Sequence, residues 1–244
     1  MWGHGNMVKD KRRLNTAEYN AEPFYRSATG QVARQLIMRK LAPLISSDSD
    51  NIAAAGIGFT APYLGKASGI VQLQSVGHTP PPPQPRQQCA IIDPIKLPLL
   101  DASLDLCLMV HGLEASSSPS ATLDETWRVL KGQGKLVLVV PHRANIWSMK
   151  EVTPFGFGQP YSVNQIKKLL KQHDFEVGKI RQSLAAPPSF SGLYPKYAPL
   201  AERLPTFFGG VLIVEAHKMI YSVRGVHASP PRPRAGVVVQ PNSI

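Results

Sequence analysis

Cysteine is scarce in this sequence. Only Cys89 and Cys107 occur among 244 residues, both within apolar segments. Their spacing matches no metal-binding pattern, so we expect two reduced core residues and no metal site. No apolar run approaches the ~18 residues of a membrane helix, so no transmembrane segment is expected. The N-terminus carries charge but no apolar core, which excludes a secretory signal and makes the cytoplasm the expected location.

Acidic residues are also few: 16, against 27 Lys and Arg, for a net charge of +11. The excess lies largely in Lys9–Arg13, in Lys167–Lys171 and in the last 22 residues. Such charge is compatible with a solvated basic surface, and equally with binding nucleic acid, an anionic surface or an acidic protein. We expect a flexible basic arm (1–15), one domain (16–222) and a disordered Pro/Arg tail (223–244).

Short apolar or alternating segments indicate strands, separated by helical or proline-rich stretches. Helical spacing of apolar residues predicts a helix over 32–44. Thr60 suits the start of another helix, because its hydroxyl can cap the first turn. The run TPPPPQPR at 79–86 excludes a helix there. The expected strands are 52–55, 70–76, 89–92, 104–110, 136–140, 175–180 and 210–216.

The stretch Leu104–Pro141 organises the chain. A buried strand is followed by Ser118-Pro119, a helix start with proline in its first turn. Leu123, Trp127 and Leu130 would form the apolar face of this helix, with Gly132 and Gly134 ending it. A second apolar run then completes a strand–helix–strand unit, which implies a parallel sheet covered on both faces. We therefore predict an α/β, three-layer αβα sandwich. Its Rossmann-like sheet is mostly parallel, with an antiparallel last strand.

After this unit comes a Gly- and Pro-rich aromatic loop, 153–160, which is suited to closing over a substrate or to packing in the core. Ser162 and Gln165 then form the S-x-x-Q pattern that caps a helix. Leu200 and Leu204 suggest a further short helix.

Four segments resemble motifs of the class I S-adenosylmethionine-dependent methyltransferases of the methyltransferase-11 type. Asp93–Asp105 (DPIKLPLLDASLD) resembles the signature D-x-x-x-L-P-f-x-D-x-S-F-D. His111–Glu114 (HGLE) is similar to H-x-L-E-H, and Glu125–Leu136 (ETWRVLKGQGKL) to E-x-x-R-V-L-K-P-G-G-x-L. Tyr161–Val177 resembles the family's Y-S-x-x-E-L and G-F-E-V elements. The resemblance spans about residues 30–220.

This resemblance implies S-adenosyl-L-methionine as the cofactor. A glycine-rich turn would let the backbone approach the adenosine, and polar side chains would hold its ribose and adenine edges. The implied cofactor-binding residues are Gly56, Gly58 and Thr60 in the turn, Gln74 near the ribose, Asp93 at the adenine, and His111 and Leu113 beside the methionine.

The cofactor motif also departs from the family pattern. Ala54 stands where the family has an acid, Thr60 where it has a third glycine, and Gln74 where an acid would bind the ribose. A neutral amide accepts fewer hydrogen bonds than a carboxylate, and a lost partner for a buried hydroxyl costs about 1–3 kcal/mol. The connection 77–88 is just long enough for a parallel crossover, and its prolines exclude the usual helix.

Three residues are candidates for catalysis: His111, His142 and Tyr161. His111 suits a general base that removes a proton from the methyl acceptor, or a packed, hydrogen-bonded loop histidine. His142 lies at an expected strand end, and Tyr161 follows the aromatic loop. Glu114 is expected to support its own loop.

The leading hypothesis is methyl transfer to an unknown, small-molecule acceptor. The alternative is a catalytically inactive methyltransferase fold that acts as a partner-binding or regulatory module, as the departures at Ala54, Thr60 and Gln74 suggest. A third hypothesis is binding of RNA or an anionic surface through the basic termini, which would weaken steeply with salt.

Overall fold

The computed structural model describes residues 21–46, 52–64, 70–75, 88–143, 146–149, 153–187, 193–203 and 209–220. The expected arm (1–15), the tail (223–244) and the proline run (79–86) lie outside these residues, and what was expected of them stays a prediction.

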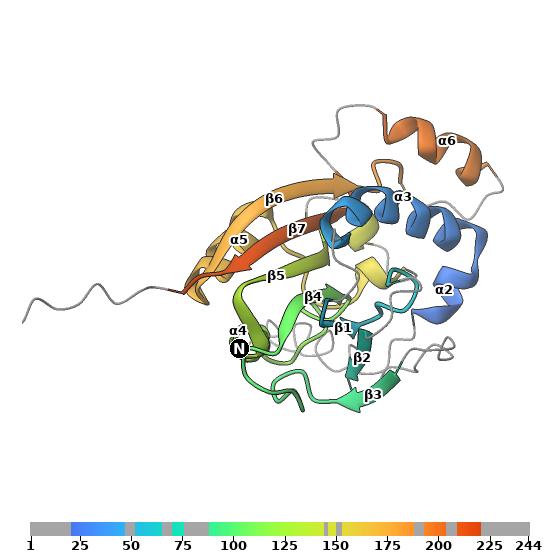
Figure 1. Cartoon of the computed structure of the whole chain (residues 1–244). Helices are drawn as coiled ribbons and strands as arrows, with labels where there is room; N and C mark the ends of the chain where they lie inside the picture. Colours follow the sequence, from blue (N-terminus) through green and yellow to red (C-terminus); the bar gives the residue numbers. More distant parts are fainter. Residues whose placement is uncertain are drawn as a thin grey trace, which may run out of the picture.

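Seven strands form one sheet in the order β3-β2-β1-β4-β5-β7-β6 (Figure 1). β1 to β5 pair in parallel, and β7 lies antiparallel between β5 and β6. This confirms the mostly parallel sheet with an antiparallel last strand. The strands are β1 (Ala54–Gly58), β2 (Ile70–Ser75), β3 (Gln88–Ile92), β4 (Leu104–Val110), β5 (Leu130–Pro141), β6 (Phe175–Ser183) and β7 (Val211–Lys218).

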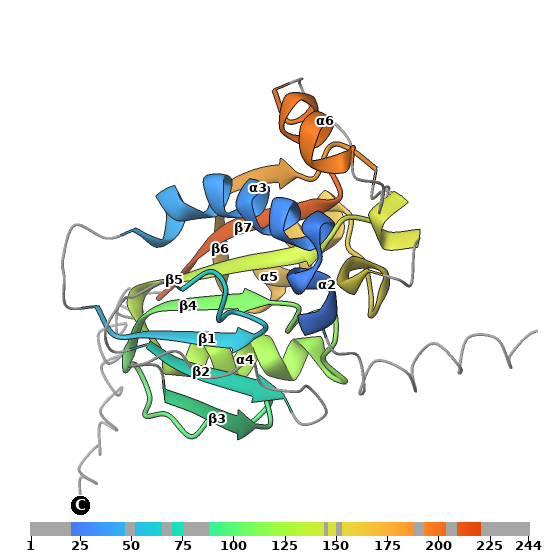
Figure 2. The same ribbon diagram turned by 90° about the vertical axis from the view of Figure 1, so that its right-hand side faces the viewer.

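Helices cover both faces of the sheet, which confirms the three-layer sandwich (Figure 2). Along β4, Leu108 and Val110 pack in the core that includes α2, α3 and α6. Cys107 and Met109 point the other way, into the core that includes α4 and α5. The helices are α2 (Glu22–Arg26), α3 (Ala28–Ile45), α4 (Pro119–Val129), α5 (Val163–Gln172) and α6 (Tyr194–Ala201), with single turns at Ile146–Met149 and Pro154–Gly156.

Helix α4 ends earlier than its sequence predicts. Leu130 already belongs to β5 and pairs with Leu104 on β4, so it does not extend the helical face. Gly132 and Gly134 lie within β5, where the register with β4 shifts, and Gln133 between them has φ of 65°. The glycines therefore accommodate an irregular strand pairing and do not end the helix.

The expected helix start at Thr60 is also wrong for the described residues. Residues 61–64 form a turn, and the Thr60 hydroxyl is buried without a hydrogen-bond partner. The capping box of α5 is confirmed: Gln165 N donates to Ser162 Oγ, and Ser162 N donates to Gln165 Oε1.

Glu125 and Arg128 of α4 hold the segment that follows β3. Glu125 Oε1 accepts from Leu97 N at 2.7 Å, and Arg128 donates to Leu97 O and Leu99 O. The two side chains pair through both carboxylate oxygens, and Arg128 also pairs with Asp101. These residues of the ETWR motif thus clamp the loop and lie away from the strand ends.

Within the described ranges, no helix is long and apolar enough to cross a membrane. The same residues contain no cluster of three or more His, Cys, Asp or Glu with a geometry for holding a metal ion.

Candidate functional site

The parallel strands β1 to β5 end at one edge of the sheet, and most of the expected site residues follow those ends. β1 has β2 on one side and β4 on the other, so the chain order reverses at this point. Ligands of open α/β sheets bind outside the carboxyl ends of the strands at such a reversal.

Gly58 brings the ends of β1 and β4 into close contact. Its φ is 82°, in the left-handed region that favours glycine. A Cβ atom there would lie 2.2 Å from Val110 O, and the next residue, Phe59, donates its N–H to the same carbonyl at 2.7 Å. Only glycine fits this last position of β1, and the close packing of β1 on β4 is sufficient reason for it.

Gly56 makes room for a neighbouring side chain. A Cβ at Gly56 would meet Thr60 Oγ1 at 2.2 Å and Leu64 Cδ1 at 2.6 Å. The threonine at the expected third glycine position therefore packs on the first glycine. Its buried hydroxyl has no partner among the described residues.

Gln74 and Asp93 lie at the ends of the neighbouring strands β2 and β3. The backbone of Gln74 pairs with Ile91, two residues before Asp93. Asp93 is exposed, and its Oδ1 accepts from Ile95 N at 3.1 Å, which orders the loop that follows β3. The strand register thus places these two expected cofactor residues on adjacent strands of the same edge.

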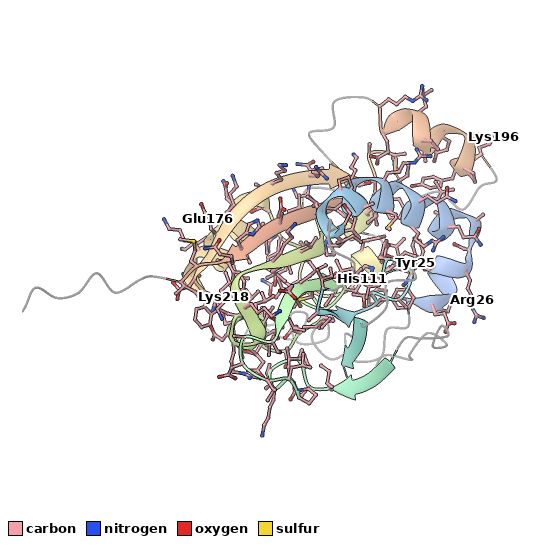
Figure 3. All side chains as sticks on the ribbon, in the orientation of Figure 1. Tyr25, Arg26, His111, Glu176, Lys196 and Lys218 are labelled. Carbon is pink, nitrogen blue, oxygen red and sulfur yellow. The ribbon has the colours of Figure 1, made fainter. Side chains whose placement is uncertain are left out.

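His111 directly follows β4, and a buried chain of hydrogen bonds runs through its ring. Figure 3 labels His111 and Tyr25, two of its members. Tyr63 Oη donates to Tyr25 Oη at 3.0 Å, and Tyr25 Oη lies 2.9 Å from His111 Nε2. His111 Nδ1 lies 3.0 Å from Glu114 Oε1. With the Tyr25 hydrogen directed to Nε2, Nδ1 carries the imidazole hydrogen and donates it to Glu114.

His111 is therefore a hydrogen-bonded loop histidine in this structure. Both of its ring nitrogens are engaged, its side chain is buried, and its φ of 55° is unusual for a residue other than glycine. Direct removal of a proton by His111 stays a prediction, and it would require one of these two bonds to open.

Two polar atoms beside this chain have no hydrogen-bond partner among the described residues: Glu114 Oε2 and Tyr161 Oη. Both residues are buried, with 4% and 5% of their surfaces exposed. Burial, and secondarily the charge of Glu114, raises the pKa of the Tyr161 phenol, so Tyr161 stays protonated and can donate. Buried polar groups are nearly always satisfied, so these two atoms are candidate contacts for a ligand.

His142 and Tyr161 are brought together by the backbone. They form an isolated parallel bridge, and Arg143 N donates to Tyr161 O. His142 Nδ1 donates to Gly209 O at 3.0 Å, which fixes the ring on the connection to β7. Leu113, expected beside the methionine, is fully buried in the core with α4 and α5.

Aromatic rings surround the His111 chain. Tyr25 stacks on Phe59 with ring centroids 5.0 Å apart, and Phe155 lies 5.0 Å from the His111 ring. The expected aromatic loop is closed over this site, because Gln159 N donates to Glu114 O and a Cβ at Gly158 would lie 2.3 Å from the same atom. The loop therefore shields Glu114 from solvent.

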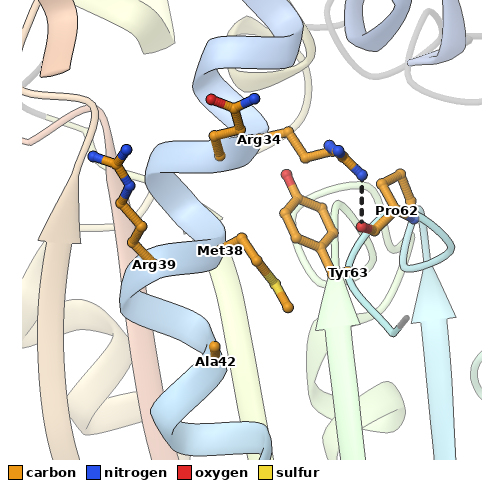
Figure 4. A pocket seen from close by; sticks show the side chains of 7 residues that line it. Arg34, Met38, Arg39, Ala42, Pro62 and Tyr63 are labelled. Atoms are coloured by element: carbon orange, nitrogen blue, oxygen red, sulfur yellow. Dashed lines mark hydrogen bonds between the residues drawn. The ribbon is translucent and has the colours of Figure 1, made fainter. Parts of the chain in front are cut away.

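A cavity of about 480 Å³ lies between α3 and the turn after β1 (Figure 4). Tyr63 and Met38 line it, and Arg34 closes one side by donating to Pro62 O at 3.2 Å. Tyr63 thus connects this cavity with the buried hydrogen-bond chain. A second cavity, of about 250 Å³, lies near the Asp105–Lys131 pair, where β4 and β5 begin.

Sequence reasoning missed Tyr25 and Tyr63 and gave Glu114 only a supporting role. Tyr25 comes from α2 and Tyr63 from the turn after β1, so no spacing rule connects either with His111. The one local signal was the separation of His111 and Glu114 by three residues, which lets their side chains meet in a tight turn.

A methyltransferase domain family model matches residues 70–138. No curated protein sequence matches the chain. Among solved structures, a methyltransferase of Thermotoga maritima, described as a possible histamine N-methyltransferase, is 17% identical with a TM-score of 0.59, covering 81% of this chain and 94% of that one. The [4+2]-cyclase SpnF is 17% identical (TM-score 0.55), covering 80% of this chain and 84% of its own.

A third structure is a methyltransferase in complex with the Haloferax volcanii Trm112 methyltransferase activator. It is 15% identical with a TM-score of 0.57, covering 86% of this chain and 97% of that one. At these identities the likeness shows the fold. The chain therefore has the fold of class I S-adenosylmethionine-dependent methyltransferases, and its central segment matches the methyltransferase domain model.

Proposed function

We propose that the protein transfers a methyl group from S-adenosyl-L-methionine to a small-molecule acceptor. The observation that carries this proposal is a group of buried polar atoms without partners in the loops after β1, β4 and β5: Thr60 Oγ1, Glu114 Oε2 and Tyr161 Oη. In a protein with only a structural role, each such group would lower the folding stability by about 1–3 kcal/mol without a compensating function.

The residues at this edge fit the cofactor. Its adenosine needs close backbone approach and polar groups at the strand ends, which Gly58 at the end of β1 and the exposed Asp93 after β3 would supply. Gln74 lies near the end of β2, between these two strands. The Thr60 hydroxyl offers a further hydrogen bond near the turn. The bound cofactor would supply an electrophilic methyl group.

This chain's own residues would position the acceptor and exclude water. The loop 153–160 covers Glu114, and the rings of Tyr25 and Phe155 pack against His111. Methyl transfer depends mainly on holding the acceptor in line with the methyl group, so a rigid, closed pocket is the main requirement. The Thermotoga neighbour, described as a possible histamine N-methyltransferase, supports a small acceptor.

Isothermal titration with S-adenosyl-L-methionine and S-adenosylhomocysteine tests the proposal. We expect both to bind the wild-type protein, and Asp93→Asn to weaken both by about 10- to 100-fold, because a charged hydrogen-bond acceptor is lost. Glu176→Gln on β6 is the matched control, since it removes the same charge from an exposed side chain remote from His111 (Figure 3).

Absence of binding at millimolar cofactor would overturn the proposal and favour the inactive, partner-binding alternative. If the protein binds the cofactor but methylates none of the acceptors offered, it would be a cofactor-binding protein without transferase activity. A protein partner, nucleic-acid binding and cytoplasmic location stay predictions.

A further inference from the structure

We infer that Glu114 takes the proton released by the methyl acceptor and that the acceptor is an amine. The inference rests on the proposed methyl transfer and names the substrate class of the same site. It assigns to Glu114 the role that sequence reasoning gave to His111.

The two oxygens of Glu114 have different environments. Oε1 accepts from His111 Nδ1 at 3.0 Å, and Oε2 has no hydrogen-bond partner among the described residues. The side chain is only 2% exposed, so bulk water does not satisfy this atom. The hydrogen bond at Oε1 thus holds the carboxylate in place, and Oε2 is left to interact with a ligand.

The His111 chain holds this carboxylate in place. His111 has no open nitrogen, because Nε2 is bonded to Tyr25 and Nδ1 to Glu114. Tyr63 in turn donates to Tyr25 and fixes the direction of the chain. We therefore assign a positioning role to His111, Tyr25 and Tyr63. The chain of hydrogen bonds ends at Glu114, whose Oε2 has no partner among the described residues.

The charge of Glu114 selects among acceptors. A carboxylate in a closed, largely apolar site repels a carboxylate or phosphate acceptor and attracts an ammonium group. An alcohol is a far weaker acid than an ammonium, so a carboxylate is a poor base for oxygen and an adequate one for nitrogen. The rings of Tyr25 and Phe155, beside His111, also suit a cationic group.

The transfer balances with Glu114 as the base. Glu114 Oε2 first takes one proton from the bound ammonium group, so the carboxylate becomes a carboxylic acid and the nitrogen gains a lone pair. That lone pair forms the bond to the methyl carbon, the electron pair of the broken carbon–sulfur bond stays on sulfur, and the product is a methylammonium group. Tyr161 Oη, which also lacks a partner among the described residues, is available to hydrogen-bond the acceptor.

The first test measures charge at the methyl position with two cofactor analogues. Sinefungin carries an amine in place of the methyl-sulfonium group, and S-adenosylhomocysteine lacks the methyl. An acceptor nitrogen reacts from about 3–3.5 Å, so a carboxylate that contacts it also lies near the sinefungin amine. We expect the wild-type protein to prefer sinefungin by about tenfold or more, and Glu114→Gln to reduce this preference to about threefold or less.

The glutamine variant keeps an acceptor for His111 Nδ1–H, and thermal melting checks its fold. Asp93→Asn is the matched control, expected to weaken both analogues equally and to preserve the preference. A wild-type protein without the preference, or a Glu114→Gln protein that retains it, overturns the inference while the proposed function stands. Failure of both analogues to bind the wild-type protein overturns the two together.

The second test compares butylamine, butanol and butyrate on the protein loaded with S-adenosylhomocysteine, by saturation-transfer NMR. We expect a signal for butylamine that is lost in Glu114→Gln. No butylamine signal, or an equal or stronger one from butanol or butyrate, overturns the assignment of an amine acceptor.

Discussion

The hydroxyl of Tyr25 lies 2.9 Å from Nε2 of His111, although 86 positions separate the two residues in the chain. Tyr25 belongs to α2 and His111 follows β4, so this bond fastens the N-terminal helix to the carboxyl edge of the sheet. The site therefore combines a residue of the N-terminal helix α2 with a residue that follows the central strand β4.

Tyr25→Phe is expected to lower the free energy of unfolding by about 1–3 kcal/mol, because His111 Nε2 and Tyr63 Oη lose a partner in a buried place. Chemical denaturation measures the change. Tyr197→Phe is the matched control: its ring is 37% exposed and its hydroxyl has a long, 3.5 Å contact, so a change within about 0.5 kcal/mol is expected. Equal effects of the two substitutions would contradict the role of the buried chain.

Tyr161→Phe should act in the opposite direction. Its hydroxyl is buried without a partner among the described residues, so removing it is expected to leave stability unchanged or raise it by up to about 1 kcal/mol. If the hydroxyl contacts the acceptor, methyl transfer slows while cofactor affinity, measured by titration, stays the same. A marked loss of stability would instead assign Tyr161 a structural bond.

Gly58→Ala is expected to destabilise the protein by at least about 1–3 kcal/mol and to abolish cofactor binding. The new Cβ would lie 2.2 Å from Val110 O, at a φ of 82° that disfavours alanine. Gly178→Ala is the control, since its nearest atoms lie 3.4–3.5 Å away. Melting curves and cofactor titration of both variants decide the point, and a stable, cofactor-binding Gly58→Ala protein would count against the proposed turn.

Arg128→Lys should loosen the attachment of the loop after β3. It should also make the free energy of unfolding depend less on pH in the acidic range. Arg128, through its hydrogen bonds, holds the pKa of Glu125 below its ordinary value near 4.5. A lowered carboxyl pKa stabilises the fold above about pH 4.5, and this contribution is lost as the pH falls below that value. The lysine cannot reproduce the fork of bonds to Glu125, so the difference from wild type should be largest near neutral pH.

The exposed pair Arg26–Glu22 supplies the control for this measurement. Arg26 is 73% exposed at its side chain, and Arg26→Lys is expected to change stability by less than about 0.5 kcal/mol at any pH. Denaturation series from pH 3 to 8 compare the variants, and identical acid limbs for wild type and Arg128→Lys would refute the clamp.

Local patterns predicted the parts of the fold that local forces determine. The strand Leu104–Val110 and the Ser162–Gln165 capping box were predicted with the boundaries that the structure has. The end of α4 was not, because Leu130 pairs with Leu104 across the sheet, and this long-range pairing prevails over helical spacing.

The candidate site likewise has features that follow from local sequence and features that depend on tertiary packing. Gly58 and Asp93 could be placed from motif spacing, since Gly58 ends β1 and Asp93 directly follows β3. The engagement of both His111 nitrogens could not, because their partners come from separate elements. The open oxygen of Glu114 is likewise a property of packing, which no sequence pattern encodes.

The position of β7 has a consequence for how the protein is made. β7 fills the slot between β5 and β6, yet it is synthesised after both. Until Val211–Lys218 leaves the ribosome, β6 has no partner strand and β5 presents an unpaired apolar edge. From the synthesis of β6 until β7 emerges, the nascent chain therefore exposes the unpaired edges of β5 and β6. A truncation before residue 211 would leave these edges unpaired and yield an aggregating chain, because the last strand in the sequence completes the sheet.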